Sequence, residues 1–432
     1  MATDLPSVPT VRLEIPDYDH GLRGKFVRAE KVADGAQAAM CTIMYGLSVC
    51  DEVVDTPLSS AANGYPDAFA RPDFNTLVDV PWRPATQAVI ADMVDDDGEL
   101  LPESPRTAIH RLLAGYEHLG LEPIMGFEYE TYVMTADGRA PLGRTVSAYS
   151  LLRIAETSDL ADAFMARMES IGCPVEAFHS ELGPGFFEFA LAPAPALQAA
   201  DRAARARQVF RELCAERGLL ATFMAKLHIA ESGSGGHVHQ SLNRGGVNVF
   251  SDGQGQLSEV GRAYVGGLLA SMGDLTLLFN PYINSYKRLG AAFFVATRAT
   301  WGYDNRNAAC RTILNSGAKG ARVEHRRPGA DASPYLVTAA MLAGGLHGLR
   351  NNLDPGLPLT VGADVAATGS ALPTSLREAI TAFESSTLAR ELLSDRFVAT
   401  YAATRHGEQR AFDDWFNSHV TEWEHNRYPE HI

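Results

Sequence analysis

The sequence contains no uninterrupted apolar run that approaches the roughly 18 residues of a membrane-spanning helix. Cysteine is scarce, and no two cysteines have Cys-x-x-Cys spacing: the five are Cys41, Cys50, Cys173, Cys214 and Cys310. This usage argues against a disulfide scaffold or a zinc ribbon and favours free thiols in a reducing compartment. The N-terminal segment has no apolar stretch typical of a secretory signal, so we expect a cytoplasmic protein.

Basic residues are also fewer than acidic ones: the sequence has 37 Lys and Arg residues and 52 Asp and Glu residues, which gives a formal net charge of -15 at pH 7. Such a surface attracts neither nucleic acid nor an acidic membrane, and we expect neither as a partner. Arginines nevertheless crowd into residues 288–327. Because guanidinium matches phosphate and carboxylate in a bidentate way, this region is a candidate for local anion binding.

Ionisable side chains recur at alternate positions in four strand-like segments. The first two contain Glu128 and Glu130, then Glu181 and Glu188; the next two contain His237 and His239, then Arg322, Glu324 and Arg326. Since successive side chains of a strand point to opposite faces, each segment turns its ionisable residues to one face and apolar residues to the other. Buried carboxylates need a cationic partner, so we expect a curved sheet that gathers these groups in a cleft.

Several carboxylates with one or two imidazoles form a hard, oxygen-rich site that favours Mg²⁺ or Mn²⁺ over Zn²⁺. Two such ions beside a group of arginines are typical of phosphoryl transfer. The loop 233–236 is not a P-loop, because it lacks the Lys-Ser/Thr ending and precedes a strand. The pair His237-x-His239 alone also suits a metal hydrolase or a cupin, although residues 240–246 lack the Glu that a cupin requires.

The chain divides near Pro102. Residues 1–102 are β-rich, with strands expected at 24–32, 76–80 and 87–94 and a long loop at 53–74. Ser104 as N-cap and Pro105 at the first position predict a helix through Leu119. We therefore expect an N-terminal domain at 1–102 and a larger domain at 103–432, in which the helix 198–217 exposes a basic side.

The ordered motifs of residues 76–428 resemble those of the glutamine synthetase superfamily. They are Gly-Phe-Glu-Tyr-Glu at 126, Glu-x-x-Pro-Gly-x-x-Glu at 181, Gly-Ser-Gly-Gly-His-Val-His at 233, Asn-Ser-Tyr-Lys-Arg-Leu at 284, Asp-Asn-Arg at 304, Arg-Val-Glu-His-Arg at 322 and Ser-Pro-Tyr at 333. The resemblance implies an α+β fold: a small N-terminal β-grasp domain and a catalytic domain with a curved antiparallel sheet flanked by helices. It also implies ring-shaped homo-oligomers with active sites between subunits.

The resemblance further implies a role for each matching residue. Glu130, Glu181 and Glu188 resemble the ligands of one metal ion, and Glu128, His237 and Glu324 those of a second ion on the ATP side. Gly233, Arg288 and Arg326 match positions that hold glutamate, and His239, Ser241, Lys319 and Arg322 match positions that hold ATP. Arg306 and Arg311 match catalytic residues that face the transferred phosphoryl group, while Tyr149 and Phe294 are expected beside the amine.

Three departures bear on the substrate. The segment 290–295 reads Gly-Ala-Ala-Phe-Phe-Val and lacks the acid that glutamine-forming members use on ammonium. Ser232 stands where an Asn contacts glutamate, and Phe186 where a Gln is common. An aromatic pocket suits an apolar amine better than a small cation. We therefore expect an ATP-dependent ligase that joins glutamate to an organic amine through γ-glutamyl phosphate. The alternatives are an ammonia-using glutamine synthetase, a catalytically silent binding protein and a metal hydrolase.

Overall fold

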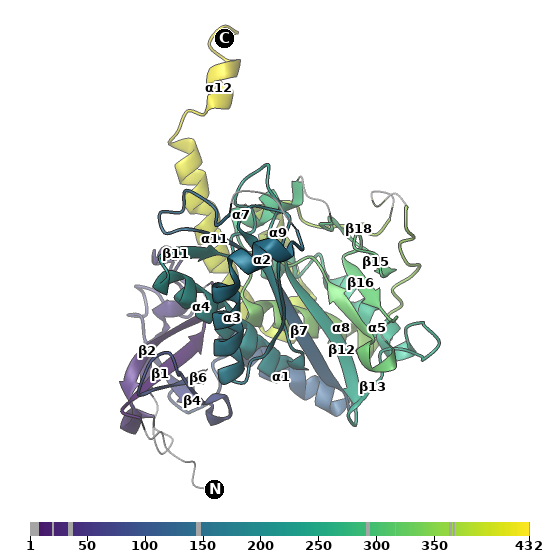
Figure 1. Cartoon of the computed structure of the whole chain (residues 1–432), viewed down its shortest axis with the longest axis horizontal. Coiled ribbons are helices and arrows are strands. Elements are labelled where there is room, and N and C mark those ends of the chain that lie inside the picture. Colours follow the sequence, from purple (N-terminus) through teal and green to yellow (C-terminus); the bar gives the residue numbers. More distant parts are fainter. Residues whose placement is uncertain are drawn as a thin grey trace.

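The computed structural model describes residues 8–19, 21–32, 38–143, 148–290, 294–315, 317–362, 365 and 368–431. Two β-sheets, one in the N-terminal part and one in the remainder, are covered by helices (Figure 1). Across these ranges, the helices are too short or too polar to cross a membrane.

The N-terminal sheet is mixed. Its strands are β1 (Thr10–Pro16), β2 (Leu22–Arg28), β3 (Ala38–Cys41), β4 (Asp67–Pro72), β5 (Val78–Asp79) and β6 (Thr86–Val94), joined by the 3₁₀ turns η1 (Ala29–Lys31), η3 (Thr42–Tyr45) and η4 (Phe74–Thr76). The order is β2-β1-β6-β4-β3, with β1 parallel to β6 and antiparallel to β2. The long loop predicted at 53–74 is present at 53–66, but its last part was wrongly predicted, because β4 forms there and pairs with β3 and β6.

The larger sheet is almost entirely antiparallel and follows the order β15-β16-β17-β12-β7-β9-β8. Its strands are β7 (Glu122–Thr135), β8 (Val175–Ser180), β9 (Phe186–Leu191), β10 (Ala194–Pro195), β11 (Leu219–Thr222), β12 (Gly236–Arg244), β13 (Val247–Asn248), β15 (Trp301–Tyr303), β16 (Cys310–Ile313) and β17 (Arg322–His325). A separate ribbon pairs β14 (Arg298–Ala299) with β18 (Ser370–Ala371). The predicted alternation holds along β7 and β9, where Phe127, Tyr129, Phe187 and Phe189 are buried on the face opposite the acids.

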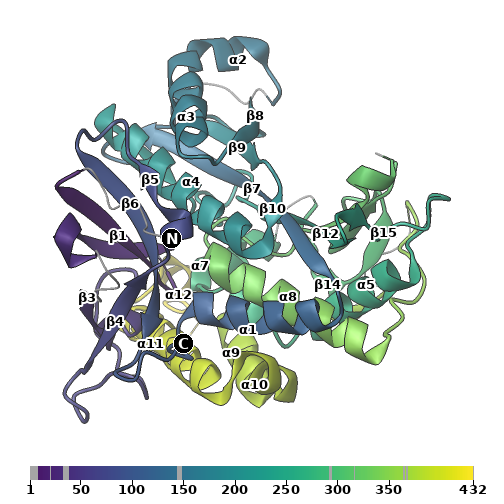
Figure 2. The ribbon, with the colours of Figure 1, turned by 90° about the horizontal axis from the view of Figure 1, so that it is seen from below.

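Helices cover the apolar face of the larger sheet and the end of the molecule beyond it (Figure 2). They are α1 (Pro105–His118), α2 (Leu151–Glu156), α3 (Ser158–Ser170), α4 (Ala196–Glu216), α5 (Glu259–Ser271), α6 (Thr276–Phe279), α7 (Ile283–Lys287), α8 (Pro334–Asn351), α9 (Leu376–Ser385), α10 (Thr387–Leu393), α11 (Asp395–Asn417) and α12 (Glu422–Arg427), with η5 (Arg288–Gly290) and η6 (Ala318–Gly320). Phe164 of α3 and Phe210 of α4 lie with ring centroids 4.9 and 5.7 Å from Phe189. This aromatic packing fixes β9 and thereby the direction of the acids on its other face.

A buried arginine connects the N-terminal part to the rest of the chain. Arg106 of α1 is 1% exposed and forms ion pairs with Asp73 (2.7 Å), Asp92 (2.6 Å) and Asp201 (3.1 Å). Asp92 lies in β6, whereas Asp201 lies in α4. The predicted basic exposed side of α4 fails for two of its arginines, because Arg205 and Arg207 are buried, the former against Glu14 of β1.

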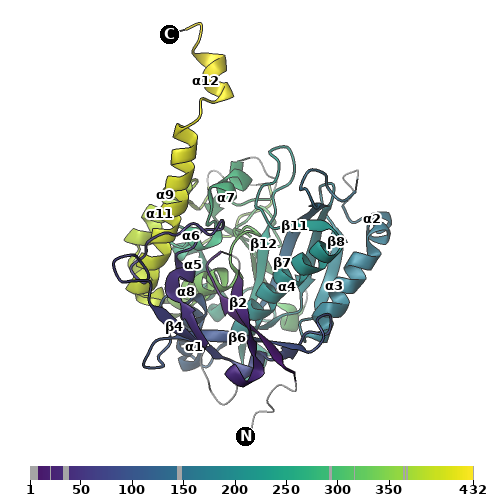
Figure 3. The ribbon, with the colours of Figure 1, turned by 90° about the vertical axis from the view of Figure 1, so that its left-hand side faces the viewer.

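The last two helices form an arm. α11 leaves the body of the molecule, and α12 continues it to the C-terminal end (Figures 1 and 3). Large apolar side chains are exposed along this arm: Trp415 (56%), Phe416 (48%), Val420 (68%) and Trp423 (60%). Exposed apolar residues this close together are typical of a surface that binds another protein.

Replacement of Arg106 by Ala should lower the free energy of unfolding by about 3–5 kcal/mol, because it leaves three carboxylates without their buried cation. The exposed pair Arg377–Asp413 provides the matched control, and Arg377→Ala should cost less than about 1 kcal/mol. Urea unfolding measures both, and equal effects would show that Arg106 does not hold the two parts together.

Candidate active site

The register of the larger sheet brings the predicted acids and imidazoles side by side. Glu130 of β7 pairs with Glu188 of β9, and Glu128 pairs with His237 of β12. On the next strand, His239 pairs with Glu324 of β17, which pairs in turn with Arg311 of β16. Residues separated by up to about 200 positions therefore form one row across five strands.

Contacts divide the row into two clusters that could each hold a metal ion. In the first, His237 Nδ1 lies 3.1 Å from Glu128 Oε1 and 3.6 Å from Glu324 Oε1, and His239 Nε2 lies 3.5 Å from Glu128 Oε2. Ligand atoms of Glu128, His239 and Glu324 all lie within 4.8 Å of one another.

The second cluster contains a histidine that the sequence did not single out. His179 Nε2 lies 2.8 Å from Glu188 Oε1, and His179 Nδ1 lies 3.6 Å from Glu181 Oε1. Their ligand atoms also meet within 4.8 Å. Glu130 lies beside this cluster and accepts a hydrogen bond from Gly235 N at 2.5 Å. The six predicted metal ligands thus lie together, with His179 and His239 as further donors.

Burial and mutual repulsion keep part of this acid row protonated near neutral pH. Burial raises the pKa of Glu130 to about 7, despite the opposing charge of Arg288. Burial also raises the pKa of Glu188 to about 7, against the hydrogen bond from His179, and the hydrogen bond to Glu188 raises the pKa of His179 to about 9. Burial disfavours the ionised form of Glu128 and so tends to raise its pKa. Hydrogen bonds from His237 and His239 outweigh this effect and hold the pKa of Glu128 well below the ordinary value.

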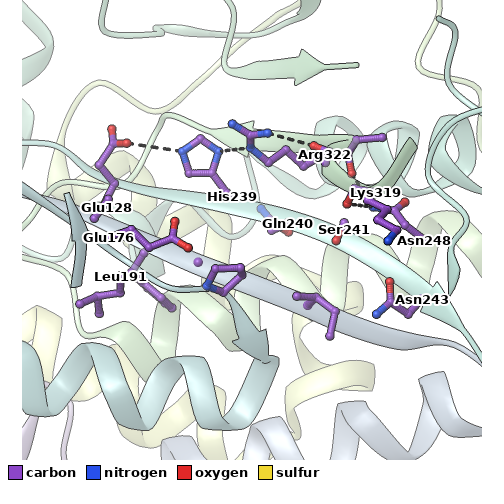
Figure 4. Close-up of a pocket in the computed structure, with 17 residues that line it drawn as sticks. Glu128, Glu176, Leu191, His239, Gln240, Ser241, Asn243, Asn248, Lys319 and Arg322 are labelled. Carbon is purple, nitrogen blue, oxygen red and sulfur yellow. Dashed lines mark hydrogen bonds and ion pairs between the residues drawn. The ribbon is translucent and has the colours of Figure 1, made fainter. Parts of the chain in front are cut away.

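One side of the row opens into a cavity of about 450 Å³, here called cavity A. All four residues predicted to hold ATP line it: His239, Ser241, Lys319 and Arg322. Arg322 Nε donates to His239 Nδ1 at 3.1 Å, and Glu128 lies on the other side of the imidazole (Figure 4). Glu176 also points into the cavity (Figure 4), from the irregularity between Val175 and Ala177 where β8 shifts its register against β9.

The other side opens into a cavity of about 370 Å³, here called cavity B. All three residues predicted to hold glutamate line it, namely Gly233, Arg288 and Arg326, together with Glu130, Glu181 and His237 of the metal row. Its wall also contains the apolar residues Leu182, Phe186, Phe294 and Val295. The contact between Glu128 and His237 therefore lies between the two cavities.

Of the two predicted catalytic arginines, Arg311 contacts the row directly. Arg311 Nη1 lies 2.9 Å from Glu324 Oε2, and Asp304 Oδ1 accepts from Arg311 Nε at 2.8 Å. Arg306 is exposed on the loop between β15 and β16, and its charge acts on Tyr149. Asp304, which orients Arg311, had no signal in the sequence beyond its place in Asp-Asn-Arg.

The predicted amine-side residues lie at the outer edge of the second cluster. The Tyr149 ring lies 4.8 Å from the His179 ring, and burial together with the charges of Glu181 and Glu188 raises the pKa of Tyr149. Phe294 lines cavity B in a left-handed backbone conformation (φ 64°). The segment that lacks the expected acid includes residues 291–293, which lie outside the described residues.

A family model for the glutamine synthetase catalytic domain matches residues 102–428. The chain therefore belongs to the glutamine synthetase family. This membership confirms the predicted α+β fold and the predicted class of enzyme, a carbon–nitrogen ligase, with ATP and divalent metal ions as its general requirements.

Relatives with named activities match nearly the whole chain. A glutamate–isopropylamine ligase from Pseudomonas sp is 37% identical, over 98% of this chain and 95% of the relative. A type-1 glutamine synthetase from Dictyostelium discoideum is 33% identical, over 98% of this chain and 84% of the relative. A gamma-glutamylethanolamide synthetase from Streptomyces coelicolor is also 33% identical, over 97% and 92% respectively.

Solved structures agree with the fold. The ligand-free structure of a protein called GmaS superposes with a TM-score of 0.85 and 29% identity, over 98% of this chain and 97% of that chain. Its ADP complex superposes with a TM-score of 0.84 over the same shares.

Binding of Mn²⁺ should strengthen by at least about tenfold between pH 6 and pH 8, because Glu130 and Glu188 must each lose a proton near pH 7 before they can coordinate. Below pH 7 the protonated carboxyls oppose the ion, and above pH 7 they attract it. Calorimetry in buffers of different ionisation enthalpy should detect the released protons. Glu188→Gln should flatten this pH dependence, whereas the same change at the exposed Glu169 should not; pH-independent binding would contradict the assignment.

Proposed function

We propose that this protein is an ATP-dependent ligase that joins the side-chain carboxylate of glutamate to an organic amine. The observation that carries the proposal is the acid row between cavity A and cavity B, with Arg311 and Arg326 on Glu324 at its edge. Such an arrangement suits transfer of a phosphoryl group from a nucleotide in cavity A to an acid in cavity B.

The donor set fits divalent cations with oxygen preference, and we propose Mg²⁺ or Mn²⁺. Glu130, Glu181 and Glu188 would hold one ion, and Glu128, His237 and Glu324 the other, with His179 and His239 within reach. When bound, such ions neutralise the phosphate oxygens and bring the acid and the nucleotide together.

The other residues position the reactants. Lys319, Ser241, His239 and Arg322 would hold the nucleotide, while Arg288 and Gly233 would hold the acid. Arg311 and the exposed Arg306 would offset charge on the phosphoryl group as the side-chain carboxylate attacks it and ADP leaves. The amine would then displace phosphate from the acyl phosphate, beside Tyr149 and Phe294.

The choice of amine over ammonia rests on cavity B and on the relatives. Leu182, Phe186 and Phe294 offer apolar contact to a carbon substituent, which ammonia lacks. One relative is named for the joining of glutamate to isopropylamine and another for the product γ-glutamylethanolamide, while a third is named a glutamine synthetase. An ammonia-using enzyme is therefore the second candidate.

A coupled ADP assay with glutamate and a panel of amines tests the proposal. With isopropylamine or ethanolamine, kcat/KM should exceed that with ammonium by at least about tenfold, the range that apolar pocket contacts supply. Equal or faster turnover with ammonium would instead support a glutamine synthetase. No ADP release with any amine, although ATP binds, would support a silent binding protein, and activity without ATP would support a hydrolase.

We further propose that copies of this chain assemble, as the resemblance to ring-shaped enzymes implies, and that the division at 102/103 separates two domains. The aromatic arm of α11 and α12 supports assembly. A two-turn helix such as α12 is marginal in water by itself, and its exposed tryptophan would be covered by another copy.

Replacement of Trp415 and Trp423 together by Gln should lower the molar mass in solution, as measured by light scattering after gel filtration. The exposed Leu357 on the body provides the control, because Leu357→Gln removes a similar apolar side chain outside the arm. If the double variant keeps the wild-type mass, the arm does not hold the assembly together.

A further inference from the structure

A third cavity, here called cavity C, lies apart from the metal row and has a volume of about 390 Å³. Its wall combines part of α4, the segment 222–225 that begins at the end of β11, and residues of α7 and α11. Among the described residues, none that lines cavity C also lines cavity A or cavity B. Ala225 O accepts a hydrogen bond from Ser234 N at 2.9 Å, so the segment 222–225 lies between cavity C and the loop 233–236. Cavity C is therefore a separate space and not a branch of the candidate active site.

Two arginines one helical turn apart on α4 line cavity C, and within the described part of the chain neither forms an ion pair. Arg207 is 2% exposed; its Nη1 donates to Ala332 O at 2.7 Å, while its Nε has no hydrogen-bond partner among the described residues. The guanidinium carbons of Arg207 and Arg211 lie 5.1 and 5.4 Å from the centre of the Phe223 ring. Burial and the charge of Arg207 lower the pKa of Arg211 to about 10. Two neighbouring, poorly solvated cations are stabilised by an anion, and a carboxylate fits the guanidinium geometry.

The negative groups of cavity C are also unmatched. Asp331 is 8% exposed and accepts from Ser285 Oγ at 2.5 Å through Oδ2, but its Oδ1 has no partner among the described residues. The side chain of Glu408, on α11, has no hydrogen bond or ion pair within the same ranges. Burial raises the pKa of both acids, that of Asp331 to about 6. Asp19 differs, because Arg405 Nη2 lies 2.8 Å from its Oδ1.

We propose that cavity C binds a small zwitterion such as an α-amino acid, with its carboxylate on the two arginines of α4 and its ammonium group toward Asp331 and Glu408. A ligand with both charges supplies the partner that each pair of groups lacks. A simple anion would leave the acids unmatched, and a simple cation would leave the arginines unmatched. The volume of cavity C lies within the range of roughly 300–1,000 Å³ that is typical of small-molecule sites. This site does not depend on the proposed ligase activity.

Calorimetric titration of the whole chain with glycine, in the absence of glutamate and nucleotide, tests the proposal. Arg211→Gln should weaken glycine binding about 10- to 100-fold, as expected for a lost charge-assisted hydrogen bond. Arg211 is only partly buried, so this variant should fold, which circular dichroism checks. The same change at Arg217, an exposed residue just after α4, is the matched control and should leave the affinity within about twofold.

Acetate, which carries the carboxylate of glycine without its ammonium group, tests the acidic side of cavity C. It should bind at least about tenfold more weakly than glycine, because it offers no donor to the acids. Glu408→Gln should weaken glycine binding, since it removes one of the two negative charges, and should not weaken acetate binding.

Three results would overturn the assignment. Loss of glycine binding in Arg288→Gln, with none in Arg211→Gln, would place glycine in cavity B. Equal affinities for glycine and acetate would make cavity C a site for simple anions, and no binding of glycine to the wild-type protein would leave it without a zwitterionic ligand. Failure of the ligase proposal is distinct, because it is read from ADP release and not from glycine binding.

Discussion

The repulsion between carboxylates on one face of the larger sheet is the constraint on which the rest of the structure depends. Glu130 and Glu188 pair directly across β7 and β9, and like charges at such a position, with Cβ atoms about 5 Å apart, destabilise a sheet. Burial raises the pKa of each to about 7, and the charges of neighbouring acids add to this effect. The fold tolerates this repulsion because the opposite face is aromatic and closely packed, and divalent cations would turn the repulsion into attraction.

The same row explains why two cavities lie on one sheet. On β8 and β9 the ionisable groups are acids with His179, and on β7 and β12 they are acids with His237 and His239. At β16 and β17 they are Arg311 and Arg326 beside Glu324. Charge therefore passes from negative to positive across the strands. A nucleotide and an acid that approach from the two sides would meet near the Glu128–His237 contact. There, divalent cations held by the acids, together with Arg311 and Arg326, would compensate negative charge on a phosphate.

The sequence was sufficient to predict the faces of the strands but not the contacts that depend on register. Alternation placed Glu128, Glu130 and Glu188 correctly on one face, because it is a local property. The place of Glu176 in cavity A was not predicted, because a shift in the register of β8 against β9 changes the direction of its side chain. Such irregularities leave no clear pattern in one sequence. The burial of Arg205 in α4 could not be predicted, because its partner, Glu14 of β1, lies 191 residues away in the sequence.

Under the proposed function, cavity B would bind both the acid and the amine, and different parts of its wall would contact each. The buried Arg288 offers a fixed charge, which discriminates strongly because an unmatched buried charge is costly. Leu182 and Phe294 offer apolar surface, which discriminates weakly, by the few kcal/mol of a methylene group or two. The enzyme should therefore be strict toward the acid and permissive among small amines, and its amine range can change through apolar substitutions that leave the acid subsite intact.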